Sequence, residues 1–249
     1  VHNDKPFYLL GKAGARMSFL PGWFPAGVMA TRGPAALSFI GFTENTADQA
    51  DYTFTAASIG TADVTRRVVV VIHWADSAVT TTLEDSVTIQ GIAATLHAQA
   101  SGGLSNCAIA SALVPTGTTA DIVFGTVSNT PVDRAAIGVY RAINESVATP
   151  HATASDTTIA TNVMSTTINI PATGWVVAGT NFANAGTPTA DTWVGVTEQY
   201  GGAAGDAAAQ YRTGGFQSGL PVETGRTVSC TITASINPAS GRLAAMSWG

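Results

Sequence analysis

Charged side chains are scarce in this chain of 249 residues, because Asp, Glu, Lys and Arg make up only 11% of it, against about 25% in an ordinary soluble domain. Lysine occurs only at Lys5 and Lys12. The net charge is −5, and the scattered arginines form no basic stripe that would neutralise a phosphate backbone. We therefore expect no nucleic-acid partner and a neutral surface rich in hydroxyl groups.

Long apolar runs are also missing. The longest runs, such as 68–74, fall far below the ~20 residues that cross a bilayer, and no charged-then-apolar export signal stands at the N-terminus. No window of eleven or more residues carries a helical apolar stripe. We expect no membrane insertion, and the lack of crossover helices argues against a parallel α/β sheet.

Only two cysteines occur, Cys107 and Cys230, and each lies inside a strand-like run. Cysteine packs as a small hydrophobic residue, so we expect two buried free thiols. A disulfide is the alternative if the two strands are neighbours.

Catalytic and metal-binding motifs are missing as well. The sequence has neither a G-x-S-x-G turn nor a glycine-rich phosphate loop. Its four histidines lack metal-ligand spacing, and we interpret His73 and His97 as hydrogen-bonded sheet residues. Asp76, Glu84 and Asp85 share one predicted loop, where calcium is the alternative to solvated turn residues. We expect no enzymatic activity, no cofactor and no metal; a polysaccharide hydrolase with dispersed carboxylates is the weakest alternative.

The chain is rich in short segments with a period of two, in which β-branched or aromatic residues alternate with polar ones. Clusters of Gly, Pro, Asn, Asp or Thr separate them. Strands of this number must pack as two antiparallel sheets or close a barrel. We predict an all-β protein, an antiparallel β-sandwich that is jelly-roll-like, with 67–74 as a central strand because it is apolar on both faces. The predicted strands are 37–42, 52–59, 67–74, 87–98, 107–114, 121–127, 136–143, 158–170, 175–182, 193–200, 227–236 and 243–248.

The first 36 residues differ from the remainder. Prolines and glycines at this density block both helix and central strand, so we predict an irregular N-terminal arm over 1–36 and a single β-sandwich domain over 37–249. Apolar side chains in an irregular segment must lie against something. The arm either docks into a neighbouring subunit or wraps its own domain, and disorder is the third alternative. Its candidate partner-docking residues are Phe7, Tyr8, Leu9, Leu10, Phe19, Trp23 and Phe24.

Three aromatic residues are candidates for a glycan site. Trp193, Tyr200 and Tyr211 flank the glycine-rich stretch 201–206, and aromatic faces exposed in the loops of a sandwich stack on sugar rings. In the competing interpretation, which we favour, Trp193 and Tyr211 are core or cross-strand residues.

A series of strand and turn segments forms a further pattern. The segments are Phe39-Ile40-Gly41-Phe42, Asp51-Tyr52-Thr53-Phe54, Ser58-Ile59-Gly60-Thr61-Ala62, Arg66-Arg67-Val68-Val69-Val70-Val71, Val87-Thr88-Ile89-Gln90-Gly91-Ile92-Ala93-Ala94, Val114-Pro115-Thr116-Gly117 and Ile137-Gly138-Val139-Tyr140-Arg141. This pattern resembles a β-sandwich module of structural proteins from tailed bacteriophages and prophages. The resemblance covers about residues 37 to 182 and involves no catalytic motif.

This resemblance implies a virion component of the head-decoration, head-spike or tail-associated type. Such a protein binds other virion proteins and copies of itself, and it is assembled in the bacterial host cytoplasm. A low-charge surface with few lysines agrees with this expectation, because dense symmetric contacts disfavour repelling charges and long flexible side chains. The alternative is a carbohydrate-binding module of a spike or tail fibre that recognises a host surface glycan.

Overall fold

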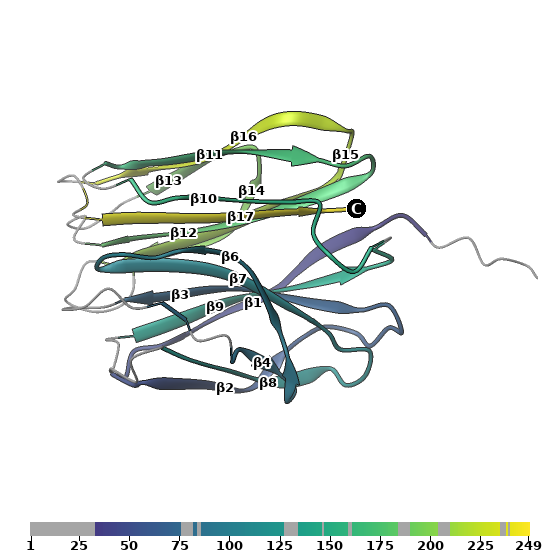
Figure 1. Cartoon of the computed structure of the whole chain (residues 1–249). Helices are drawn as coiled ribbons and strands as arrows, with labels where there is room; N and C mark the ends of the chain where they lie inside the picture. Colours follow the sequence, from purple (N-terminus) through teal and green to yellow (C-terminus); the bar gives the residue numbers. More distant parts are fainter. Residues whose placement is uncertain are drawn as a thin grey trace, which may run out of the picture. The chain divides into compact units, whose positions relative to one another are not determined.

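The structure is a computed structural model, and it describes residues 33–75, 82–83, 86–126, 134–145, 147–158, 161–183, 190–203, 210–234, 238 and 240–249. Residues 33–249 form one compact unit (Figure 1). The described residues form strands and no helix, which confirms the predicted all-β class. The strands are β1 (Ala36–Asn45), β2 (Asp51–Ser58), β3 (Arg67–Ala75), β4 (Thr88–Ile89), β5 (Ile92–Ala93), β6 (Thr95–Ala100), β7 (Ser105–Leu113), β8 (Thr119–Gly125), β9 (Arg134–Ile143), β10 (Ala152–Asp156), β11 (Val163–Ile170), β12 (Gly174–Ala183), β13 (Ala190–Val194), β14 (Thr197–Ala203), β15 (Tyr211–Leu220), β16 (Glu223–Thr233) and β17 (Ser240–Trp248).

Antiparallel pairing joins these strands into four sheets that are stacked face to face (Figure 1). We number them in the order of the stack. Sheet 1 has the order β2-β8-β4-β5, sheet 2 β1-β9-β3-β7-β6, sheet 3 β10-β17-β12-β15-β14, and sheet 4 β11-β16-β13. A single sandwich would have two sheets, so residues 37–249 contain two sandwiches within one compact unit.

Each sandwich is a jelly roll. In the first half of the chain β1 pairs with β9, β2 with β8 and β3 with β7. In the second half β10 pairs with β17, β11 with β16 and β12 with β15. This nested pairing of first with last strands is a long hairpin wrapped into two sheets, as in a jelly roll. Strand order therefore repeats between the N-terminal jelly roll (sheets 1 and 2) and the C-terminal jelly roll (sheets 3 and 4).

Three hydrophobic cores fill the spaces between the four sheets. Sheet 2 is covered on both faces, so β3 sends Val68, Val70 and Ile72 toward sheet 1 and Val69 and Val71 toward sheet 3. This arrangement confirms the central position predicted for 67–74 and explains why its residues are apolar without alternation. Strand β12 in sheet 3 is buried along its whole length for the same reason.

The space between sheets 2 and 3 joins the two jelly rolls. The sheets face each other with opposite strand orders, so β6 lies over β10 and β17, while β1 lies over β15. Trp175 and Trp248 stack in this space with ring centroids 5.9 Å apart, and Tyr140 contacts Phe216 at 5.8 Å. All four rings belong to one buried cluster or pack against it, so the two jelly rolls share a core.

The two cysteines are free and buried, as expected from the sequence. Cys107 lies in the core between sheets 2 and 3, and Cys230 lies in the core between sheets 3 and 4. Burial raises the pKa of both thiols above the ordinary value. Neither thiol is therefore suited to form a thiolate at neutral pH.

Two strands were missing from the prediction. Strand β10 has the sequence ATASD and offers no large apolar residue. Strand β15 contains glycines, which are depleted from strands in general, but here they serve packing: a Cβ on Gly214 would clash with the hydroxyl of Tyr200. In addition, the predicted strand 193–200 divides into β13 and β14 at Gly195, whose φ is +85°.

Candidate functional site: a groove between two edge strands

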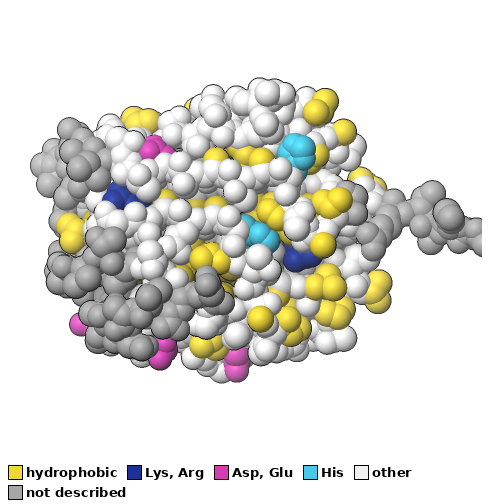
Figure 2. All heavy atoms as spheres, viewed as in Figure 1, with side chains coloured by type: hydrophobic (Ala, Val, Ile, Leu, Met, Phe, Trp, Pro, Cys, Tyr) yellow, Lys and Arg dark blue, Asp and Glu magenta, His cyan; other side chains and the backbone are white. Residues whose placement is uncertain are grey.

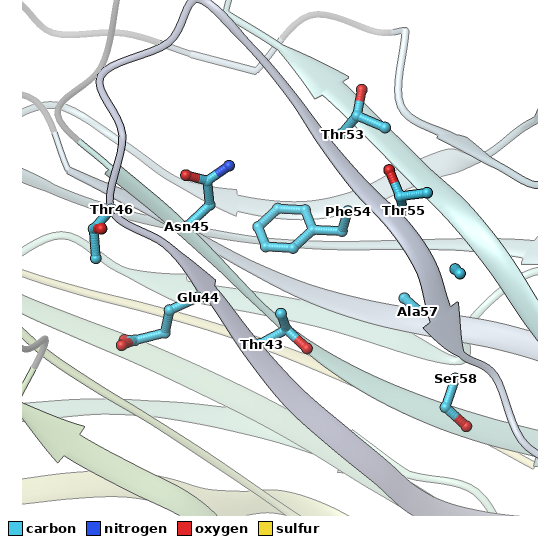
Figure 3. Close-up of a pocket in the computed structure, with 10 residues that line it drawn as sticks. Thr43, Glu44, Asn45, Thr46, Thr53, Phe54, Thr55, Ala57 and Ser58 are labelled. Carbon is cyan, nitrogen blue, oxygen red and sulfur yellow. The ribbon is translucent and has the colours of Figure 1, made fainter.

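A groove lies between β1 and β2 at one side of the N-terminal jelly roll (Figure 3). Strand β1 is an edge of sheet 2 and β2 is an edge of sheet 1, so one side of each strand has no neighbouring strand in its sheet. The groove has a volume of about 520 Å³ and is lined by residues 43–46 and 53–58. Two open strand edges thus face a common space.

A β-bulge shapes the β2 side of this groove. The register with β8 shifts between Phe54 and Ala57, and Ala56 adopts the left-handed region with φ +52°. The Ala56 N–H donates to Oδ1 of Asp121 at 2.8 Å, which holds the bulge in place. Bulges on edge strands limit indiscriminate pairing with another sheet. The edge of β2 therefore does not offer a flat, regular strand for pairing with another sheet.

The floor of the groove is apolar and its walls are polar. In Figure 3 the ring of Phe54 lies between the two strands, with Thr43, Asn45 and Ala57 around it. Phe54 is buried and its ring lies 5.9 Å from that of Phe124, which fixes it to the core below. Open backbone edges with an apolar floor are what an extended peptide requires, because the main chain pairs and alternate side chains enter pockets.

One carboxylate lines the groove: Glu44, which is paired with Arg212 at 3.1 Å. Other carboxylates lie near it but outside its lining. Asp121 accepts from the Ala56 N–H from the β8 side of β2, and Asp48 and Asp51 are exposed in and beside the β1–β2 connection. Acidic side chains are visible in Figure 2 along the edge of the molecule that sheet 1 occupies. The groove is therefore apolar at its floor, and the carboxylate that lines it is already paired.

The arginines of the described residues are already engaged. Arg66 is buried and donates to the carbonyls of Val114, Gly60 and Thr116 at 2.7, 2.7 and 2.6 Å. The other engaged arginines and their partners are Arg67 with Glu145, Arg141 with Asp63, Arg212 with Glu44, Arg226 with Glu223 and Arg242 with the carbonyls of Gly102 and Thr157. Little positive charge is left to balance the exposed carboxylates.

Net charge is divided unequally along the chain. Residues 1–32 contain Lys5, Lys12, Arg16 and Arg32 but only one carboxylate, Asp4, so they carry +3. Because the whole chain carries −5, residues 33–249 carry −8. The first 32 residues are thus net positive, whereas the rest of the chain is net negative.

The three aromatic candidates for glycan stacking lie largely inside the protein. Tyr200 is 8% exposed and stacks on Phe42 with centroids 4.5 Å apart, and Tyr211 is 5% exposed. Trp193 is half-buried, and its Nε1 donates to Thr213 Oγ1 at 2.9 Å. Tyr200 and Tyr211 therefore offer no open ring face to a sugar. The burial of Tyr211 agrees with the packing interpretation given for Trp193 and Tyr211.

Tyr211 takes part in a polar cluster that joins β13, β14 and β15. Its hydroxyl donates to Asp191 Oδ1 at 3.0 Å, and Thr213 Oγ1 makes a short contact with Asp191 Oδ2. Burial and the neighbouring Asp191 raise the pKa of Glu198 above its ordinary value. Asp191 is thus saturated by cross-strand partners that hold the C-terminal jelly roll together.

Both strand histidines are hydrogen-bonded, as expected. His73 Nε2 lies 2.9 Å from Tyr200 Oη, and His97 Nε2 lies 2.7 Å from Ser111 Oγ. Burial lowers the pKa of His73 to about 3 and that of His97 to about 4. Within the described part of the chain, no three His, Cys, Asp or Glu side chains come together as metal ligands.

A second polar cluster lies where the chain passes from one jelly roll to the other. Arg67 Nε donates to Glu145 Oε2 at 2.7 Å, and its guanidinium lies 4.5 Å from the ring centre of Trp248. Trp248 Nε1 donates to the carbonyl of Val147 at 2.9 Å. Burial raises the pKa of Glu145 to about 7, against the opposing effect of Arg67. This cluster fastens the last strand to the connection between the jelly rolls.

Several predicted residues lie outside the described part of the chain. The docking candidates Phe7, Tyr8, Leu9, Leu10, Phe19, Trp23 and Phe24 are among them, and so are Asp76, Glu84 and Asp85 of the alternative calcium loop. Those interpretations stay predictions.

No protein-family model matches the chain, and no curated protein is similar to it in sequence. No helix in the described ranges is long and apolar enough to cross a membrane.

Sequence reasoning missed the groove, because it depends on two edge strands from different sheets. The only local signals are the alternation of Tyr52 and Phe54 with outward threonines, which gives the apolar floor, and the nearby carboxylates. Neither signal shows that β1 and β2 leave a space between them.

Proposed function

We propose that the protein is a structural component of a tailed-phage or phage-like particle that binds neighbouring particle proteins through its N-terminal segment. The observation that carries this proposal is the difference in charge and composition between residues 1–36 and the compact body that follows. All lysines lie in the first 12 residues, while the body is a four-sheet stack with three packed cores. A body of this kind suits a structural role, and the N-terminal segment suits attachment to neighbouring particle proteins.

The end of the body from which β1 starts adds apolar surface to this attachment. Val64, Leu113, Val147 and Val222 are 85%, 50%, 50% and 70% exposed. They lie in or beside the connections β2–β3, β7–β8, β9–β10 and β15–β16, which all meet at that end of the stack (Figure 1). Each of these side chains is exposed to a neighbouring protein that binds at this end. Attachment by this end would leave the opposite end free.

The outer faces of the stack suit close packing of neighbours. Sheet 4 exposes short hydroxyl side chains in cross-strand rows, including Ser165 opposite Ser229 and Thr192 opposite Thr231. Short side chains lose little rotamer entropy in a contact, and lysine is depleted from interfaces. A surface of this kind supports a particle protein packed beside copies of itself.

Substitution in the N-terminal segment of the full chain tests the proposal. Phe7→Ser, Leu9→Ser and Trp23→Ser together remove apolar side chains without shortening the protein. We expect this variant to sediment as a folded monomer while the natural chain forms oligomers or joins particles. A matched variant with Val163→Ser, an exposed residue of sheet 4, should assemble normally, because serine keeps the short hydroxyl side chains of that face. Assembly of the triple variant at the natural level would contradict the proposal.

The alternative proposal, a carbohydrate-binding module for host recognition, has weaker support. Of its three aromatic candidates only Trp193 is half-buried rather than buried. Glycan-array binding that disappears in Trp193→Ala, with the fold retained, would favour this alternative over the structural role.

A further inference from the structure

Arg212 is a fully buried charged residue at the boundary between the two jelly rolls. It is the second residue of β15, in sheet 3, and its side chain is 0% exposed. Its Nη1 donates to Oε1 of Glu44 on β1, in sheet 2, at 3.1 Å, so the side chain reaches from one jelly roll to the other. Burying a charge is costly unless the charge is paired and its donors are hydrogen-bonded. We therefore examine each donor of this guanidinium.

Only one side of the Arg212 guanidinium is paired. Among the residues that the structure describes, neither Nε nor Nη2 has a hydrogen-bond partner, although both atoms are buried. The N–H groups of Nε and Nη2 point in the same direction, and such a pair of donors forms the fork that binds two oxygens of one carboxylate or phosphate. Glu44 bonds to Nη1 and leaves this fork unfilled.

Arg66, which is also fully buried, shows the contrast. Its Nε donates to the carbonyl of Val114 at 2.7 Å, and its Nη2 donates to the carbonyl of Thr116 at 2.6 Å. Its Nη1 donates to the carbonyl of Gly60. The fold thus fills every side of this buried guanidinium with its own carbonyls. Unpartnered buried donors, as in Arg212, call for a bound water or ion.

The charges around the fork favour an ion of negative sign. Burial lowers the pKa of Arg212 to about 10; Glu44 opposes this shift and the neighbouring charge of Arg134 adds to it. The guanidinium therefore stays charged at neutral pH. His73, which also faces Arg212, has a pKa of about 3 because it is buried, so it is neutral. A cation with a positive neighbour and little water around it is stabilised by an anion.

We propose that the Nε and Nη2 fork of Arg212 binds a small oxyanion, such as inorganic phosphate or sulfate, at the boundary between the two jelly rolls. Two oxygens of the anion accept from the fork, while Glu44 keeps its bond to Nη1. This site goes beyond the proposed attachment role, because it concerns the cohesion of the body rather than the N-terminal segment. An anion held by β15 beside β1 stabilises the contact between sheet 3 and sheet 2.

Phosphate titration of the full chain tests this proposal. At constant ionic strength we expect saturable binding of one phosphate per chain by calorimetry, with a thermal midpoint that rises with phosphate concentration. Arg212→Lys keeps the positive charge but lacks the fork, so it should weaken phosphate binding about tenfold or more. Arg226→Lys is the matched control, because Arg226 is half-buried and paired with Glu223 at 2.8 Å. It should bind phosphate like the natural chain.

Glu44→Gln provides a second test that does not alter Arg212. This substitution removes the negative charge beside the fork and keeps a side chain of similar size. We expect it to tighten phosphate binding about threefold or more, because the anion is then no longer repelled. Circular dichroism should show unchanged strand content in each variant. A purely structural role of the Arg212–Glu44 pair predicts no gain in affinity.

Two results would overturn the site. Absence of saturable phosphate binding by the natural chain means that water or another acceptor fills the fork. Equal binding by the natural chain and Arg212→Lys means an adventitious ion only. Neither result affects the proposed attachment role, because that role is tested separately by the Phe7, Leu9 and Trp23 variant.

Discussion

The two jelly rolls have the same strand order but expose different chemistry. Sheet 1 of the N-terminal jelly roll carries outward carboxylates at Asp51 and Asp121 and borders a groove. Sheet 4 of the C-terminal jelly roll exposes mainly threonine and serine along β11 and β16. Inward alternation of apolar residues is retained in both and determines the fold, whereas the outward positions are free to differ. The same topology therefore presents a groove and carboxylates in one half and a hydroxyl-rich face in the other.

The largest expected loss of stability comes from the core that the two jelly rolls share, and it tests whether they unfold together or independently. Trp248→Ala removes a ring that stacks on Trp175 and lies under Arg67 in the shared core. We expect a loss of about 3–5 kcal/mol in the free energy of unfolding, measured by denaturant titration. Both jelly rolls should unfold in a single transition. Two separated transitions in the natural chain would show that they are independent.

The next largest effect concerns the packing of Tyr200, from the C-terminal jelly roll, against the N-terminal jelly roll. A Cβ on Gly138 would lie 2.5 Å from the Tyr200 hydroxyl oxygen. We expect Gly138→Ala to lower the free energy of unfolding by about 1–3 kcal/mol through overpacking. Gly41→Ala on β1 is the matched control, because its Cβ would meet no atom within 4 Å. Equal stability of the two variants would contradict the packing described for Tyr200.

Acid should weaken the contact between the jelly rolls. His73 has a pKa of about 3 in the folded protein because it is buried, against about 6.5 when unfolded. The unfolded chain therefore binds more protons below pH 6.5, and stability falls as pH falls toward 3, with a limiting slope of about 1.4 kcal/mol per pH unit. His73→Gln should flatten this loss between pH 6.5 and 4.5. An unchanged pH profile would exclude His73 as its source.

Glu145 should have the opposite effect from His73 on how stability depends on pH, and the effect should be smaller. Burial raises its folded pKa to about 7, so the folded protein binds the proton more tightly than the unfolded chain, whose carboxyl has a pKa near 4.3. Stability contributed by the protonated form is present at low pH and is lost as pH rises toward 7. Glu145→Gln should raise the thermal midpoint at pH 8 and change it little at pH 4. A lower midpoint at both pH values would mean that the ion pair with Arg67 dominates.

Much of the fold could be predicted from alternation. The double-sided apolar run at Val68–Val71 correctly indicated a strand covered on both faces, and both cysteines were correctly expected to be buried and free. The duplication was missed because the equivalent strands β3 and β12 share burial but few identical residues. Strand β15 was missed because it is rich in glycine, and Gly214 leaves room for the Tyr200 ring from β14, a contact that no local pattern reveals.

The site was harder to predict than the fold. Composition indicated a low-charge body and a distinct N-terminal segment, and the lysines of that segment were visible in the sequence. The groove was not, because Phe54 and Thr43 are brought together by the gap between two sheets rather than by spacing along the chain. Likewise, Tyr200 is close to turn-forming glycines in sequence but packs in the core between sheets 2 and 3.

The mass of the full chain in solution tests the structural role most directly. Light scattering should be measured on the full chain and on a chain that starts at Ala36, where β1 begins. We expect an oligomer for the full chain that dissociates at high salt, and a compact monomer of unchanged strand content for the shortened chain. Compact monomers in both cases, at low and high salt, would contradict assembly through the N-terminal segment.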